Sequence, residues 1–294
     1  MEHKVDRHAM RIICWSSLII TIIILVLQIV IRQRWRYHAN VRERIFYWTL
    51  IAVYISHAIN TSMNIAFNYG WPSCTTCTDQ VVWGVVVYMI TRMFTWLFLL
   101  QRALTAQGIE RGFEPAVGPK WFTHYLPTYF IFTFSTYCVM PFIFKKNYQT
   151  DCFQYGKHGY CELLLEWSTF VTTMYAVGAF CELLNAVGML WLFIKPIQVI
   201  RGSAQSGHSR HSVEGHKLTA KLWWNVVLST LILTTTLTVN VGYLLVDYRF
   251  EYVYYCDRPI NVISCFLMLG QNGEWIGDHW KHWRRRCIRK TRSI

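Results

Sequence analysis

Residues 11–31 read RIICWSSLIITIIILVLQIVI, an almost unbroken apolar run that ends directly before Arg32 and Arg34. A helix of about 20 such residues crosses the ~30 Å hydrocarbon layer of a bilayer. The run is too long for the apolar part of a cleavable signal peptide, so it indicates a signal anchor. Six more apolar runs follow, over residues 46–67, 81–101, 122–144, 167–194, 222–246 and 253–273. The sequence therefore predicts an all-α membrane protein, a seven-transmembrane helix bundle over residues 1–273.

The basic residues gather in alternate gaps between these runs. If the amino terminus lies outside, 20 of the 29 Lys and Arg residues fall in inner segments and 8 in outer segments. Such a bias marks the cytoplasmic side of a membrane protein. It also favours a seventh span over 253–273, although Asp257, Arg258 and Pro259 interrupt that run. The inner segments 102–121, which holds several Gly and Pro residues, and 196–221, which is polar, are predicted to be irregular.

Composition excludes several classes of protein. Hydrophobic residues make up 53% of the chain and charged residues 15%, against about 25% charged residues in soluble domains. The net charge of +13 lies beside predicted spans, where anionic membrane lipids account for it, so we expect no nucleic-acid partner. The candidate ligating or catalytic groups His57, Glu182 and Glu274 are scattered over three spans. We therefore expect no metal site, no cofactor and no enzymatic activity.

Residues 274–294 form a basic tail that is rich in Trp. On a helix, Ile276, Trp280, Trp283 and Cys287 share one face, with spacings of 4, 3 and 4, and most of the arginines lie elsewhere. This pattern predicts an amphipathic helix that lies along the inner leaflet. Cys287 is a candidate palmitoylation site, because one lipid chain together with a basic patch gives stable anchoring.

Charges inside a membrane are costly and usually have partners. Arg92 falls near the middle of the third run and Glu182 near the middle of the fifth. We predict that these two residues form a buried ion pair. The pair has two interpretations: a lock that holds a resting state until a ligand or proton breaks it, and a permanent structural salt bridge.

Cysteines concentrate in the predicted outer loops, where disulfides can form. Cys77 precedes the third run, and either Cys152 or Cys161 is a candidate to close a disulfide onto it. Arg102 follows Cys77 by 25 residues, or about 37 Å along a helix, which places it at the inner mouth of the same span. The five outer cysteines are odd in number, so at least one is unpaired or bonds another chain; they are Cys74, Cys77, Cys152, Cys161 and Cys256.

The outer cysteine, the inner arginine and the basic tail together resemble a divergent G-protein-coupled receptor. Gln101-Arg102-Ala103 stands where rhodopsin-like members carry Asp-Arg-Tyr, and the seventh run lacks Asn-Pro-x-x-Tyr. The resemblance implies a plasma-membrane receptor for an unidentified extracellular ligand. It also implies signal transduction to a heterotrimeric G protein, with Arg102 as a coupling residue. A seven-span transporter, channel or lipid-handling protein is the alternative.

Overall fold

The computed structural model describes residues 7–35, 41–68, 77–109, 149–155, 158–164, 176–177, 180, 183–184, 186–195, 197–198, 212–245 and 251–268. This part of the chain is helical apart from one hairpin of two strands. Its long helices are α1 (Arg7–Trp35), α2 (Val41–Asn68), α3 (Cys77–Ile109), α6 (Ser212–Leu245) and α7 (Glu251–Met268). A shorter apolar helix covers Ala186–Lys195. The hairpin consists of β1 (Gln149–Tyr155) and β2 (His158–Leu164).

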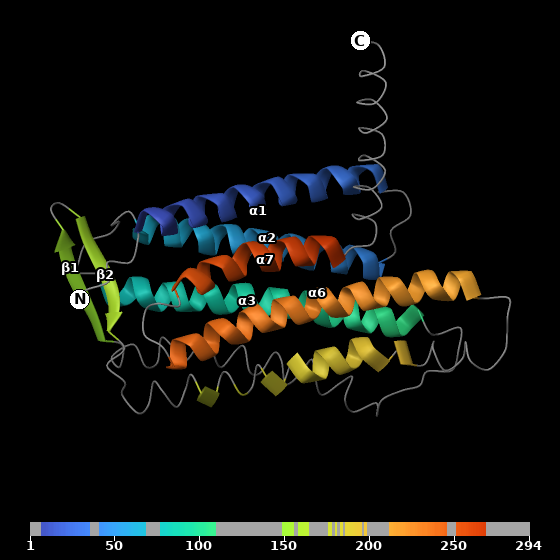
Figure 1. Ribbon diagram of the computed structural model, residues 1–294. Coiled ribbons are helices and arrows are strands. Elements are labelled where there is room, and N and C mark those ends of the chain that lie inside the picture. Colours follow the sequence, from blue (N-terminus) through green and yellow to red (C-terminus); the bar gives the residue numbers. More distant parts are fainter. Residues whose placement is uncertain are drawn as a thin grey trace, which may run out of the picture.

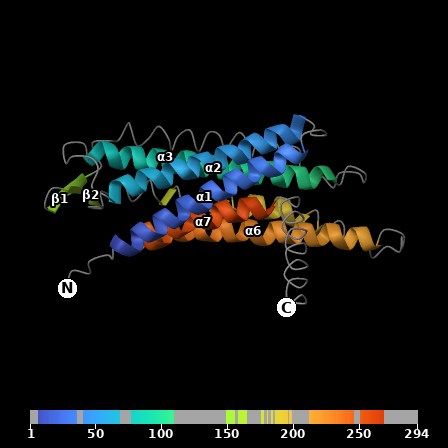
Figure 2. The same ribbon diagram turned by 90° about the horizontal axis from the view of Figure 1, so that it is seen from above.

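The long helices lie side by side as an elongated bundle (Figures 1 and 2). α1 packs against α2 and α7, α2 packs against α3, and α6 packs against α7. Figure 1 shows that α1, α3 and α7 run in one direction, whereas α2 and α6 run in the other. The hairpin lies at one end of the bundle, where α3 begins and α2 ends, and both strands contact α3.

The two faces of α1 indicate that lipid surrounds the bundle. Its buried positions recur at spacings of 4 and 3 and include polar side chains; they are Met10, Cys14, Ser17, Thr21, Ile24, Gln28 and Ile31. Its exposed positions are large and apolar, among them Ile19, Ile23 and Val26, each about half exposed. In water, an aliphatic face of this size would be costly to leave uncovered. Such a face is stable against lipid, which is as apolar as the side chains themselves.

Three helices are long and apolar enough to cross a membrane, over Ala9–Ile31, Val82–Ala103 and Leu222–Val239. They correspond to the first, third and sixth predicted spans and confirm a helical membrane protein. α2 and α7 are helices where the second and seventh spans are predicted, but they carry more polar groups. The predicted span 122–144 and the tail helix 274–294 lie outside the described residues. The number of seven spans therefore stays a prediction.

Two helices continue beyond the apolar runs that predicted them. Segments 102–121 and 196–221 were expected to be irregular, but α3 continues to Ile109 and α6 begins at Ser212. For residues 102–109 and 212–221 that expectation is wrong. An apolar run marks only the part of a helix that lies inside the hydrocarbon layer. The helix itself continues, through its backbone hydrogen bonds, until a helix-breaking residue ends it. Gly108 alone is too weak a breaker, because an interior glycine costs only about 1 kcal/mol relative to alanine.

The hairpin was not expected from the sequence. Its strands pair antiparallel from Gln149↔Leu164 to Tyr155↔His158, and two residues connect them. The connecting pair contains Gly156, a residue suited to the tight turns of short hairpins. The predicted outer loop between spans four and five thus contains regular structure at the bundle end where α3 begins.

Candidate functional site

A buried ion pair joins α3 to α7 in the interior of the bundle. Nη1 of Arg92 lies 3.6 Å from Oδ2 of Asp257, and the two side chains are 2% and 1% exposed. Arg92 is near the middle of the apolar segment Val82–Ala103, far from both ends of α3. An ionised side chain at such depth is costly, so its retention points to a specific role.

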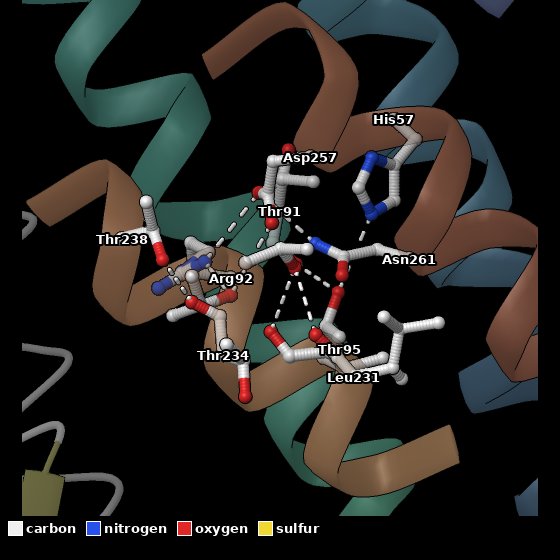
Figure 3. A network of polar contacts seen from close by, with 12 residues as sticks. His57, Thr91, Arg92, Thr95, Leu231, Thr234, Thr238, Asp257 and Asn261 are labelled. Carbon is white, nitrogen blue, oxygen red and sulfur yellow. Dashed lines mark hydrogen bonds and ion pairs between the residues drawn. The ribbon is translucent and has the colours of Figure 1, made fainter. Parts of the chain in front are cut away.

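Neighbouring polar groups hold both charges of this pair. The guanidinium of Arg92 donates a hydrogen bond to the hydroxyl of Thr236 on α6. The hydroxyl of Thr236 in turn donates a long hydrogen bond, 3.5 Å, to Oδ1 of Asp257. Asn261, one turn along α7, donates its amide to Oδ2 of Asp257 at 3.0 Å. Figure 3 shows Arg92 of α3 and Asp257 and Asn261 of α7 pointing toward one another.

Thr236 differs from Thr238 on α6 in what its hydroxyl contacts. The hydroxyl of Thr238 donates to a carbonyl group of its own helix at 2.8 Å. The hydroxyl of Thr235 donates to its own helix at 3.0–3.1 Å and also interacts with the carboxylate of Asp257. Thr236 is 2% exposed and contacts two other helices. One hydroxyl thus accepts from the cation and donates to the anion, which makes α6 part of the ion pair.

Two threonines extend the network from α3 to α2. The hydroxyl of Thr91 donates to the carbonyl of Val87 on its own helix at 2.8 Å and shares this proton with the carbonyl of Ser56 on α2, which lies 3.2 Å away. Thr95 donates to the carbonyl of Thr91 at 3.0 Å, and its oxygen lies 3.4 Å from Nε2 of His57. Because the single hydroxyl proton of Thr95 is used in the first bond, Nε2 of His57 is assigned as the donor in the second. Polar contacts from α3 therefore reach α2 through Thr91 and Thr95, and α6 and α7 through Arg92.

The electrostatics of this region are dominated by three buried charged residues. Within the described residues, Arg92, Asp257 and Arg258 are the charged side chains that are at most 2% exposed. The ring of Tyr88, one turn before Arg92, adds a cation–π contact at 5.4 Å from the guanidinium carbon to the ring centroid. A buried ion pair is sensitive to the distance between its partners. Each charge loses its hydration on burial, and the attraction of the partner charge offsets the free energy of that loss. The arrangement can therefore report a relative movement of α3, α6 and α7.

The structure places some of the sequence-predicted residues and leaves others outside its described part. Arg92 is buried and paired as expected of an intramembrane charge, but the carboxylate that it contacts belongs to Asp257. Glu182, its predicted partner, lies outside the described residues, so that pair stays a prediction. Cys77 is the first residue of α3, and α3 continues for seven residues beyond Arg102, which is partly buried. Cys287 also lies outside the described residues.

The sequence reasoning missed Asp257, Thr236 and Asn261 as parts of one site. Asp257 was interpreted as an interruption of the seventh span, although a carboxylate inside a span is itself a signal for a partner cation. That signal was available: Arg92 and Asp257 both lie inside predicted spans and have opposite charge. Nothing in the sequence separates Thr236 from Thr234 and Thr235, because only the rotation of α6 decides which hydroxyl faces the pair.

No group of His, Cys, Asp and Glu residues suited to a metal ion occurs among the residues that the structure describes. Cys14, Cys256 and Cys265 are not in disulfides. In comparisons with known proteins, no family model and no curated protein sequence matches the chain.

Proposed function

We propose that this chain is a seven-span membrane receptor that transmits an extracellular ligand signal to a cytoplasmic partner, with a heterotrimeric G protein as the partner class. The observation that carries the proposal is the Arg92–Asp257 pair, which ties α3 to α7 through Thr236 of α6. Ionisable residues inside a bundle mark functional sites, and a hydrogen-bonded pair between separate helices suits a two-state switch.

The ends of the helices support a transmembrane arrangement. Exposed Trp side chains lie toward both ends of the bundle. Trp15 and Trp83 are in the first third of α1 and α3, which begin at the hairpin end, whereas Trp48, Trp223 and Trp224 are in the first half of α2 and α6, which begin at the opposite end. Tryptophan is enriched at both membrane interfaces, where its ring packs against lipid and its N–H reaches water. Nζ of Lys195 lies 4.6 Å from the ring centroid of Trp191, a cation–π contact suited to the headgroup level.

The order of the elements supports seven crossings. α3 ends at the bundle end opposite to the hairpin, and the hairpin follows α3 in the chain. An odd number of crossings between the two fits one span, and the apolar run 122–144 can supply it. The helix Ala186–Lys195 then belongs to a fifth span that returns to the end where α6 begins. With the positive-inside bias, the hairpin end is extracellular and the start of α6 is cytoplasmic.

The proposed mechanism is a shift between two packings of α3, α6 and α7. A ligand that enters from the hairpin end and binds one packing more tightly shifts the population toward it. Pro259 lies two residues after Asp257 and has no amide hydrogen, so it weakens α7 beside the carboxylate. Movement of α6 or α7 separates the groups around Thr236 and changes the inner ends of the helices, where Arg102 and α6 meet the partner.

The test measures nucleotide exchange, because it requires no knowledge of the ligand. Membranes that contain the full chain are mixed with a panel of purified heterotrimeric G proteins, and GTP-analogue binding is recorded. We expect Asp257→Asn to raise basal exchange on at least one G protein and Arg102→Ala to abolish that increase. Thr238→Val is the matched control, because the Thr238 hydroxyl bonds only its own helix among the contacts described for it. Surface expression of each variant is measured in parallel.

The buried polar network itself favours a second candidate function. Charged and hydrogen-bonding groups inside a bundle also line the substrate pathways of transporters. If no G protein responds to the wild-type chain or to either variant at normal surface expression, the receptor proposal fails. Solute flux in proteoliposomes that Asp257→Asn abolishes would then establish a transporter.

A further inference from the structure

The register of the hairpin places two cysteines directly opposite each other. In the pairing of β1 with β2, Cys152 is the Cα partner of Cys161. In the sequence these residues are nine positions apart, and each was a candidate partner for Cys77. The antiparallel backbone makes each the nearest cross-strand residue of the other.

The position of this pair within the ladder is suited to a disulfide. Tyr155 and His158 close a two-residue connection, so they form a hydrogen-bonded pair, and the pairs alternate from there along the strands. Cys152 and Cys161 are three pairs further along and therefore form a non-hydrogen-bonded pair. At such positions the Cα atoms are about 4.5 Å apart, the closer of the two spacings in an antiparallel ladder. Disulfides usually join residues whose Cα atoms are about 4.4–6.8 Å apart.

We propose that Cys152 and Cys161 are joined by a disulfide across the hairpin. The proposal rests on the extracellular placement of the hairpin end, since disulfides form and persist in the secretory lumen and outside the cell. In the reaction, one thiolate attacks an oxidising disulfide of a lumenal oxidoreductase and forms a mixed disulfide. The second thiolate displaces the oxidoreductase sulfur. The two cysteines lose two protons and two electrons, and the oxidoreductase leaves as its dithiol.

The remaining outer cysteines agree with this pairing. Cys256 was predicted in an outer loop, but it lies within α7 beside Asp257 and is not in a disulfide, so four outer cysteines remain. Removal of Cys152 and Cys161 as a pair leaves only Cys74 and Cys77, which flank two residues in the sequence. A bond within the hairpin would stabilise the two strands against the outer end of α3, which both strands contact.

Peptide mapping of the full-length protein tests the proposal without any variant. The protein is extracted from membranes in the presence of a thiol-blocking reagent and digested with trypsin and chymotrypsin under non-reducing conditions. Lys157 and Tyr160 provide cleavage sites between the two cysteines. A cross-linked pair of peptides that contains Cys152 and Cys161, and that separates on reduction, is the expected result. A cross-link from Cys77 to either residue, or blocked thiols at both, would overturn the proposal.

Single substitutions provide a second measurement. We expect Cys152→Ser to expose one new reactive thiol at Cys161, and Cys161→Ser to expose one at Cys152, whereas the double variant exposes none. Cys77→Ser is the matched control and should leave the Cys152–Cys161 cross-link intact. An epitope tag in the connection after Tyr155, probed in unpermeabilised cells, separates the possible failures. If the cysteines are reduced and the tag is accessible, only the disulfide proposal is overturned. If the tag is inaccessible, the extracellular placement of the hairpin, on which the receptor proposal depends, is overturned as well.

Discussion

Replacement of Asp257 by Asn tests the central contact of the site. The substitution retains the shape of the side chain but removes the charge that lies 3.6 Å from Nη1 of Arg92. With an effective dielectric constant of about 20, two unit charges at this distance attract by about 5 kcal/mol. Loss of one partner of a buried pair generally costs ~3–5 kcal/mol, because the other charge stays buried. For a chain of this size, a loss of that magnitude lowers the melting temperature by on the order of 10 °C.

The assay is a thermal melt of detergent-solubilised protein fused to a fluorescent reporter, read by size-exclusion chromatography. We expect Asp257→Asn to lower the melting temperature strongly, and a swap of Arg92→Asp with Asp257→Arg to recover part of the loss. Glu182→Gln, alone and combined with Arg92→Gln, is the comparison, because Glu182 is the partner predicted for Arg92 from its similar depth in a span. Double-mutant cycles give the interaction free energy of each pair. If this energy is below ~0.5 kcal/mol for Arg92 with Asp257 but above ~0.5 kcal/mol for Arg92 with Glu182, the assignment of the pair is refuted.

Three further predictions concern α6, the lipid-facing surface and the topology. Thr236→Val should destabilise the protein by about 1.5–3 kcal/mol, because it removes hydrogen bonds to charged groups. Thr238→Val should be nearly neutral. Equal melting temperatures for the two variants would contradict the role of Thr236. Ile19→Arg should reduce membrane insertion of α1, because an arginine at the centre of a span raises the free energy of insertion by about 2.5–3.5 kcal/mol. Ile19→Leu should leave insertion unchanged. Glycosylation-reporter insertion assays measure both variants. An epitope placed after Ile294 should be reached by antibody only after permeabilisation. Staining of intact cells would exclude an odd number of spans with the amino terminus outside.

The class of protein could be predicted from the sequence because a bilayer imposes a one-dimensional rule. A span needs about 20 apolar residues whatever it packs against, so the runs that begin at residues 11, 81 and 222 were sufficient to locate α1, α3 and α6. The same rule cannot place helix ends, since a helix continues beyond the hydrocarbon layer wherever its backbone bonds remain satisfied. This is why α3 and α6 extend into segments that were predicted to be irregular.

The pairing of the two hairpin strands could not be predicted from the sequence, for a different reason. Strand pairing depends on which backbone groups meet across a short connection, and a polar loop with two cysteines has several possible pairings. The spacing of the cysteines left the partner of Cys77 open, whereas the register sets Cys152 opposite Cys161.

The sequence alone determined that the chain is a helical membrane protein and that Arg92 lies within a span and therefore needs a polar environment. Only the tertiary structure decided that Asp257 on α7 and Thr236 on α6 supply that environment. The physical reason is that apolar runs specify the depth of a residue along the membrane normal, whereas the rotation and neighbours of a helix depend on packing against the whole bundle.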